Sequence, residues 1–216
     1  MRATGVCQGY LIGPRQSFVD KKGKFFSKWG QGRKVKHSIY LLLHEGVGEE
    51  LDIEGLRDGI EEEFSLPTKV LPFDLDPEPY YDPARGQYHS TQILKEILHR
   101  VPEDASKALG IVSFDLFIPI LTFVFGEAQL DGKAALVSLA RLRQEFYGLP
   151  PNQRLLERRL LKEAKHELGH TFGLVHCPIR ECVMSVANRI TDVDAKGLTF
   201  CEGCRQLLLE ALKRSR

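Results

Sequence analysis

Residues 165–204 read KHELGHTFGLVHCPIRECVMSVANRITDVDAKGLTFCEGC, and this stretch decides the fold. Two metal-ligand patterns follow one another in it. The first has the form His166-Glu167-x-x-His170-x-x-Gly173-x-x-His176. The second joins Cys177-x4-Cys182 to a later pair, Cys201-x-x-Cys204.

The segment that leads into the histidines is predicted to be an amphipathic helix. Residues 152–167 contain no proline or glycine, and Asn152 is a suitable N-cap. Apolar residues recur at helical spacing and form a stripe of Leu156, Leu160, Ala164, Leu168 and Phe172. We therefore expect this stripe to be the buried face of the helix.

The histidine pattern predicts a catalytic zinc site. His166 and His170 are one helical turn apart, so their imidazoles can bind one zinc ion at about 2.0–2.1 Å. Glu167 lies beside the metal, where it can take a proton from a bound water whose pKa zinc lowers to roughly 7. Gly173 can turn the chain so that His176 becomes the third ligand. The alternative is a pair of surface histidines, but the extended motif is much more specific than HExxH alone.

Four of the five cysteines lie in the same stretch. Two short-spaced pairs far apart in sequence are typical of a closed four-cysteine zinc site. The alternative is two disulfides, which we disfavour because no secretory signal is visible and cytosolic thiols stay reduced. Since His176 and Cys177 are adjacent, a structural zinc would fix the loop that carries the third catalytic ligand. Cys7 is isolated and is interpreted as a free thiol.

The run HExxHxxGxxHC, the segment Cys182-x-Met184 and the final CxxC together resemble the archaemetzincins, a family of metzincin zinc peptidases. The resemblance implies a metallopeptidase with two zinc ions, one catalytic and one structural, and Glu167 as general base. It makes Met184 the Met-turn methionine, which lies beneath the metal without binding it. Ser185 stands where some metzincins carry a metal-binding tyrosine, so no tyrosine switch is expected.

The resemblance also implies the fold, an α/β (α+β) metzincin-like domain. We expect a twisted, mostly parallel sheet with an antiparallel edge strand, packed on the active-site helix and a backing helix, with a zinc-stapled C-terminal part. Residues 125–142 should supply the edge strand, along which an extended peptide would bind. The predicted divisions are a basic arm at 1–36 and one catalytic domain at 37–216, whose upper part ends at 173 and whose C-terminal part spans 174–216.

Composition sets further limits. A chain of 216 residues is most simply one domain with a short appendage. A net charge of +1 and the lack of a long apolar run argue against nucleic acid or a membrane as partner. We therefore predict a cytoplasmic monomer whose partner is a peptide or protein substrate.

The N-terminal arm has a distinctive composition. Basic residues cluster at Lys21, Lys22, Lys24, Lys28, Arg33, Lys34 and Lys36, and Phe25, Phe26 and Trp29 are interleaved with them. Such a stretch can bind single-stranded nucleic acid by charge and stacking. We favour the alternative, a solvated arm whose aromatic side chains pack on the domain.

The remaining elements follow from hydrophobic periodicity. Strands are predicted at 37–44, 68–75, 109–118, 123–125 and 133–142, the last with one exposed side. Helices are predicted at 49–64, from Ser90 or Thr91 to Val101, and after Cys204.

Several polar groups allow two interpretations. Glu61, Glu62 and Glu63 are more typical of a solvated helix face than of a carboxylate site. The proline-rich loop at 76–87 and the residue just after it carry four large side chains, Tyr80, Tyr81, Arg85 and Tyr88. These side chains either line a substrate cleft or belong to the packing of the loop. Asp192 and Asp194 either cap a helix, which we favour, or orient a ligand histidine.

Two competing functions stay open at this point. The first is a zinc-stabilised peptide- or protein-binding protein with little or no proteolytic activity. The second, weaker, is a nucleic-acid module built from the basic arm and the four-cysteine site.

Overall fold

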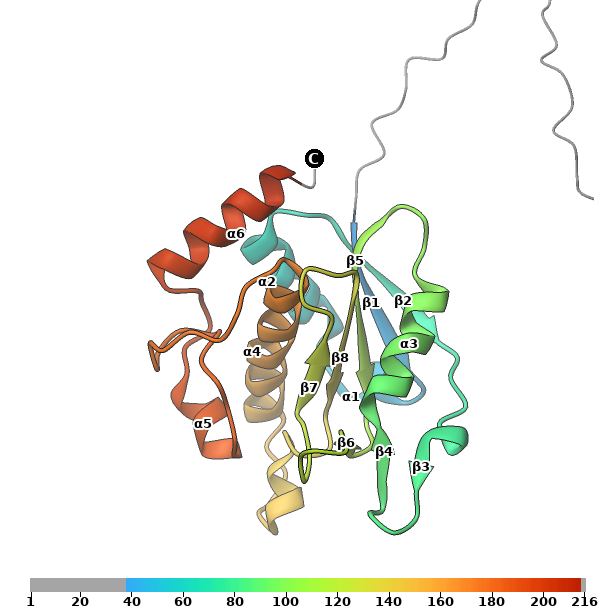
Figure 1. Cartoon of the computed structure of the whole chain (residues 1–216). Helices are drawn as coiled ribbons and strands as arrows, with labels where there is room; N and C mark the ends of the chain where they lie inside the picture. The colour runs from blue at the N-terminus through green and yellow to red at the C-terminus, as the bar shows by residue number, and fades with distance from the viewer. Residues whose placement is uncertain (1–37, 215–216) are drawn as a thin grey trace, which may run out of the picture. The chain divides into compact units, whose positions relative to one another are not determined.

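The computed structural model of the chain describes residues 38–214 (Figure 1). The predicted basic arm at 1–36, including Cys7, lies outside the described residues, so its role and the division into arm and domain stay predictions. No helix within 38–214 is long and apolar enough to cross a membrane.

The central sheet has five strands in the order β2-β1-β5-β8-β7. Their bounds are β1 Ser38–His44, β2 Thr68–Phe73, β5 Ala105–Val112, β7 Gly126–Ala128 and β8 Ala134–Ser138. The first four in spatial order pair in parallel, and β7 pairs antiparallel with β8 at the edge. This confirms the predicted mixed, mostly parallel sheet with an antiparallel edge strand.

Two strand predictions need correction. The strand expected at 123–125 and ended by Gly126 instead begins at Gly126. The strand expected at 133–142 spans only Ala134–Ser138, and all five of its residues are buried rather than exposed on one side. The reason is that β8 lies inside the sheet, between β5 and β7, and helices cover both its faces.

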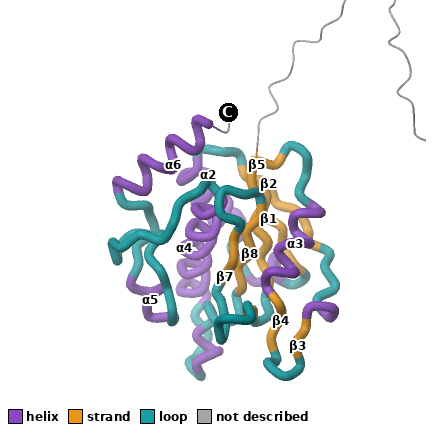
Figure 2. Tube along the Cα trace, viewed as in Figure 1, coloured by secondary structure: helices purple, strands orange, loops and turns teal. Residues whose placement is uncertain are grey.

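Helices cover the sheet on both sides (Figures 1 and 2). The helices are α1 Val47–Glu50, α2 Ile53–Phe64, α3 Ser90–Arg100, α4 Gln153–Thr171, α5 Ile190–Ala195 and α6 Glu202–Arg214, with 3₁₀ turns at Glu78–Tyr80 (η1) and Gln144–Tyr147 (η2). One hydrophobic cluster joins α2, α4 and the C-terminal segment to the sheet. A second cluster joins α3 to the opposite face.

The predicted stripe on the long helix is confirmed. Asn152 caps α4 by accepting a hydrogen bond from the Leu155 backbone N–H at 3.0 Å. Each residue of the stripe is at most 5% exposed: Leu156, Leu160, Ala164, Leu168 and Phe172. Burial of this face orients α4 and thereby decides which of its side chains face away from the core.

Two helix starts differ from expectation. The helix predicted at 49–64 is divided in two, because Asp52 caps α2 by accepting from the Gly55 N–H at 2.9 Å. Neither Ser90 nor Thr91 caps α3, since His89 occupies the N-cap position without a side-chain bond. Thr91 instead donates its hydroxyl to Glu127 on β7.

The proline-rich loop contributes to a small second sheet in the order β3-β4-β6. Its strands are β3 Tyr81–Asp82, β4 Gln87–His89 and β6 Leu116–Phe117, so the strand predicted at 109–118 is divided between β5 and β6. Tyr88 packs between Tyr81 and Phe114, with ring centroids 5.0 and 4.3 Å away. Arg85 lies over the Phe117 ring, 4.5 Å from its centroid. These contacts support the packing interpretation of the loop.

The three consecutive glutamates do not form one solvated face. Glu62 is exposed, but Glu61 accepts a hydrogen bond from the Thr68 N–H at 2.7 Å. Glu63 is buried and pairs with Lys165 of α4 and Arg205 of α6, both at 2.9 Å. The prediction was wrong for Glu63 because its cationic partners lie far away in the sequence.

Candidate active site and metal centres

The last turns of α4 carry His166, Glu167 and His170. Gly173 then adopts a left-handed conformation, with φ 88°, and its N–H donates to the His170 carbonyl at 2.9 Å. This turn directs the chain out of the helix and returns His176 to the same place, as the sequence predicts. The ring centroid of His176 lies 5.3 Å from that of His166 and 5.0 Å from that of His170.

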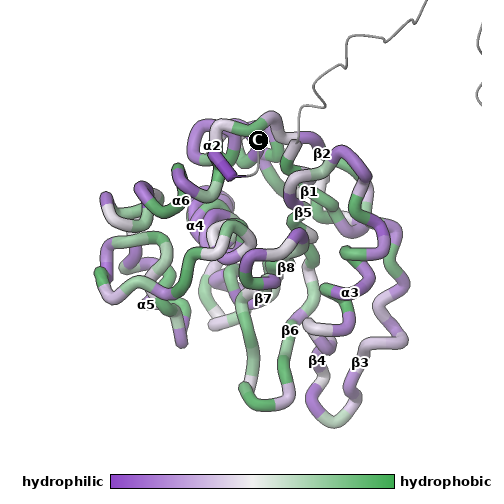
Figure 3. Tube along the Cα trace, turned by 45° about the horizontal axis from the view of Figure 1, so that its top comes forward, coloured by the Kyte–Doolittle hydropathy of each residue, from purple (hydrophilic) through white to green (hydrophobic). Residues whose placement is uncertain are grey.

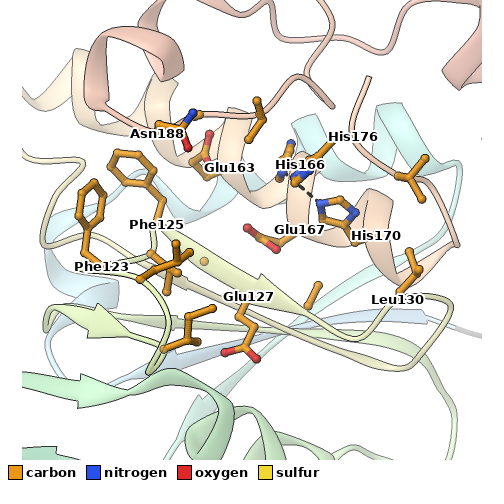
Figure 4. A pocket seen from close by; sticks show the side chains of 18 of the residues that line it. Phe123, Phe125, Glu127, Leu130, Glu163, His166, Glu167, His170, His176 and Asn188 are labelled. Carbon is orange, nitrogen blue, oxygen red and sulfur yellow. Dashed lines mark hydrogen bonds between the residues drawn. The ribbon is translucent and has the colours of Figure 1, made fainter. Parts of the chain in front are cut away.

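The three imidazoles lie close enough together to hold one metal ion. His166 and His170 direct Nδ1 at the carbonyls of Val183 and Leu174, at 2.9 and 2.7 Å. A carbonyl only accepts, so each Nδ1 carries the proton and each Nε2 presents a lone pair. The two Nε2 atoms are nonetheless 3.1 Å apart, as the dashed line in Figure 4 marks. Facing lone pairs repel unless a cation lies beside both, and tetrahedral zinc places two nitrogens about 3.3 Å apart.

Main-chain carbonyls therefore orient His166 and His170, and neither aspartate considered for this role does so. Asp192 accepts from the backbone N–H groups of Asn188 and Arg189, which is the favoured capping interpretation. Asp194 binds the Arg159 guanidinium through both carboxylate oxygens, at 2.8 and 2.7 Å. This pair joins α5 to α4 and helps to hold the C-terminal segment against the active-site helix.

The surroundings favour neutral histidines. Burial and the nearby Lys196 ammonium hold the pKa of His166 well below its usual value. Burial also lowers the pKa of His170 and of His176. Only a neutral imidazole can bind a metal, so these shifts keep the histidines ready for one at neutral pH.

Glu167 is a buried carboxylate, 6% exposed, that lies between α4 and the edge strand. Burial and then the carboxylate of Glu163 raise its pKa well above the ordinary value. A Cβ atom on Gly126 would lie 2.6 Å from Glu167 Oε1 and 2.6 Å from the Leu136 carbonyl oxygen. Gly126 is thus a site residue that the sequence analysis missed; its only signal was a glycine next to a predicted strand.

A cleft of about 620 Å³ lies in front of these groups. Glu167, His166, His170 and His176 line it, together with β7 and part of residues 118–125. Figure 4 shows Phe125, Glu163 and Asn188 toward one end and Leu130 toward the other. The loop at 118–125 is hydrophobic along most of its length (Figure 3). None of Tyr80, Tyr81, Arg85 and Tyr88 is among the lining residues.

Met184 packs under the same turn of helix. It is completely buried, and a Cβ on Gly169 would lie 2.5 Å from its sulfur. Its carbonyl accepts from the Cys177 N–H at 2.9 Å. Met184 therefore connects the floor of the histidine site to the cysteine-bearing loop.

The four cysteines of the second pattern converge. Their Sγ atoms all lie within 4.8 Å of one another, and those of Cys177 and Cys201 are 3.8 Å apart. A disulfide needs about 2.05 Å, whereas tetrahedral zinc with bonds of 2.3 Å separates two sulfurs by about 3.8 Å. A hydrogen bond with the Cys204 backbone lowers the pKa of the Cys201 thiol to about 7. The cluster therefore has the dimensions of a metal site rather than of two disulfides.

Comparisons with known proteins agree with this geometry. The model of peptidase family M54 matches residues 65–210. The archaemetzincin of Methanocaldococcus jannaschii is 49% identical over 140 residues, which is 65% of this chain and 76% of that protein. The crystal structure of archaemetzincin from Methanopyrus kandleri superposes with a TM-score of 0.72 at 36% identity, covering 84% of this chain and 98% of that one. A zinc-dependent peptidase from Methanocorpusculum labreanum gives 0.69 at 29% identity, covering 79% and 100%.

Proposed function

The chain belongs to peptidase family M54, and we propose that it is a zinc metallopeptidase of the archaemetzincin type that hydrolyses peptide bonds in the cleft in front of α4. One observation carries the proposal: three imidazoles converge beside a buried carboxylate, two of them through unprotonated Nε2 atoms, and all four groups line one cleft. A zinc ion bound there would supply a Lewis acid and an acidified water for attack on the scissile carbonyl.

The chain's own residues have the following roles. His166, His170 and His176 hold the metal. The Glu167 carboxylate takes the proton of the attacking water and passes it to the leaving amine. Its burial suits this task, because a raised pKa makes a carboxylate a stronger base. Gly126 leaves the space in which this carboxylate sits.

The four cysteines are proposed to hold a second, structural zinc. Cys177, Cys182, Cys201 and Cys204 form a closed set without an open position, which is typical of structural sites. Cys177 follows His176 directly, and its backbone N–H donates to the Met184 carbonyl. This metal would therefore fix the loop that carries the third histidine. The expected content is two zinc ions per chain, falling to about one in a Cys182→Ser, Cys204→Ser double variant.

The deciding experiment compares wild type with Glu167→Ala on an unbiased peptide library, read by mass spectrometry, with zinc measured in both proteins. We expect wild type alone to cleave, and both proteins to hold the same zinc. Glu62→Ala, which removes an exposed carboxylate from α2, is the matched control and should cleave normally. Retained cleavage by Glu167→Ala would refute the general-base role.

A binding protein without turnover remains the competing function. It predicts no cleavage by wild type even with zinc bound, and no competition between peptides and a hydroxamate for the histidine site. Binding of a hydroxamate that peptides displace would instead support an accessible catalytic metal. A cytoplasmic location and a monomeric state stay predictions from the sequence.

A further inference from the structure

Within residues 38–214, β7 is an edge strand of the sheet, and it lines the cleft. Within the antiparallel pair, the Ser138 N–H donates to the Phe125 carbonyl at 2.9 Å and the Gln129 N–H to the Ala134 carbonyl at 3.0 Å. Glu127 pairs with Leu136 midway between these bonds. Because bonded and non-bonded positions alternate, Glu127 directs its backbone groups inward to β8. Gly126 and Ala128 therefore direct theirs outward, where an extended peptide can pair with them.

The side chains of β7 point to opposite faces of the sheet. A side chain at position 126 would lie on the face of the sheet that packs against α4, because a Cβ on Gly126 would meet the Glu167 carboxylate. The side chain of Glu127 faces α3, where Thr91 Oγ1 donates to its two oxygens at 2.8 and 3.1 Å. Glu127 still lines the cleft and is half-buried. Glu127 is therefore partly exposed at the edge along which a bound peptide would lie.

The charge balance of the cleft singles out Glu127. Among residues 38–214, three glutamates line the cleft and no lysine or arginine does: Glu127, Glu163 and Glu167. Glu163 is neutralised by Lys196, whose Nζ lies 2.7 Å from its Oε1. Glu167 lies beside the proposed metal. Glu127 has only the neutral hydroxyl of Thr91 and forms no ion pair within residues 38–214.

We propose that Glu127 is a specificity-determining residue that selects peptides with lysine or arginine at the position directly opposite it. This inference rests on the proposed function. A peptide paired antiparallel with Gly126 and Ala128 places one residue opposite Glu127 in a non-hydrogen-bonded pair, whose Cβ atoms are about 4.5–5.5 Å apart and share a face. Opposite charges at such a pair favour binding by about twofold to fivefold. Because Gly126 adjoins Glu167, this position is close to the scissile bond.

A purely structural role for Glu127 makes different predictions. Its carboxylate lies at the first turn of α3, where a negative charge is favourable, and it accepts from Thr91. Glu127→Gln keeps an acceptor for Thr91 but removes the charge. Thr91→Val removes the hydroxyl but keeps the charge. If the role were structural, both variants would lose stability and neither would change peptide preference.

The test measures binding and cleavage separately. Binding of fluorescent peptides is measured by anisotropy in the full-length, zinc-loaded Glu167→Ala protein, alone or combined with each substitution. The peptides carry lysine, norleucine or glutamate at each position in turn, so that length and apolar character stay matched. We expect lysine to bind about twofold to fivefold more tightly than norleucine at one position, less so at high salt. Glu127→Gln should abolish this preference, Glu127→Lys should transfer it to glutamate, and Thr91→Val should retain it.

The outcomes separate this inference from the proposed function. Equal binding of lysine and norleucine peptides, no peptide binding at all, or a preference unchanged in Glu127→Gln would each overturn the role of Glu127. Cleavage of the same peptides by the protein with Glu167 intact would then still support a peptidase. Conversely, a lysine preference in binding without any cleavage would support the subsite and refute the proposed activity.

Discussion

A single methyl group at Gly126 tests whether the edge strand positions the proposed general base. In Gly126→Ala, the new Cβ would lie 2.6 Å from Glu167 Oε1 and 2.7 Å from its Cγ. It would also lie 2.6 Å from the Leu136 carbonyl oxygen, which belongs to an interior strand and has little freedom to move. The Glu167 side chain must therefore give way, and β7 must also shift slightly away from the Leu136 carbonyl.

The size of the effect follows from these distances. Ordinary contacts between heavy atoms are about 3.5 Å, so the carboxylate must move by about 1 Å. A misplacement of about 1 Å costs on the order of 10²-fold in rate, or about 2.7 kcal/mol of transition-state stabilisation. Overpacking adds about 1–3 kcal/mol of destabilisation, and each kcal/mol lowers Tm by roughly 2–4 °C in a domain of this size.

The assay combines kcat and KM on one cleaved peptide with zinc content and Tm. We expect kcat to fall about 100-fold while the zinc content stays that of wild type. Gly203→Ala in α6 is the control, because a Cβ there meets no atom within 4 Å and helical alanine is favourable. Wild-type kcat in Gly126→Ala would refute the positioning argument. Loss of zinc in Gly126→Ala would also contradict the positioning argument, because it would show that the methyl group disturbs the histidines rather than Glu167.

Two further predictions concern buried charge. Glu63→Gln leaves the ammonium of Lys165, which is 6% exposed, without its carboxylate partner, so the free energy of unfolding measured with denaturant should fall by about 3–5 kcal/mol. In the control Glu62→Gln, next to it, the free energy of unfolding should change by no more than about 0.5 kcal/mol. A loss below about 1 kcal/mol for Glu63→Gln would contradict the pairing. Burial raises the pKa of Glu167 in the folded state above the ordinary value of 4.5. Between the unfolded-state and folded-state pKa values, the folded chain holds a proton that the unfolded chain has released, so stability falls as the pH rises through this range. The metal-free Glu167→Gln protein should therefore have a higher Tm than metal-free wild type at about pH 8, and the two Tm values should converge below about pH 4. A constant difference in Tm across this range would disprove the raised pKa of Glu167.

The sequence alone was sufficient where the chemistry depends on local spacing. His166, Glu167 and His170 lie on consecutive turns of one helix, and Gly173 brings His176 back after a single turn. The apolar stripe on α4 predicts its buried face, because helical periodicity is a property of the chain segment itself. The mixed sheet followed from the family resemblance carried by these same motifs.

Only the tertiary structure decided the contacts between segments that are distant in sequence. Glu63 looked like one of three surface carboxylates, yet it is buried against Lys165 and Arg205 from two other helices. Gly126 looked like the end of a strand, yet it begins the edge strand and leaves the space for Glu167. Glu127 lies in the cleft because β7 pairs with β8 at the edge of the sheet. The physical reason is common to all three: helical spacing is encoded within a few residues, whereas strand pairing and ion pairs between helices depend on which distant segments the fold brings together.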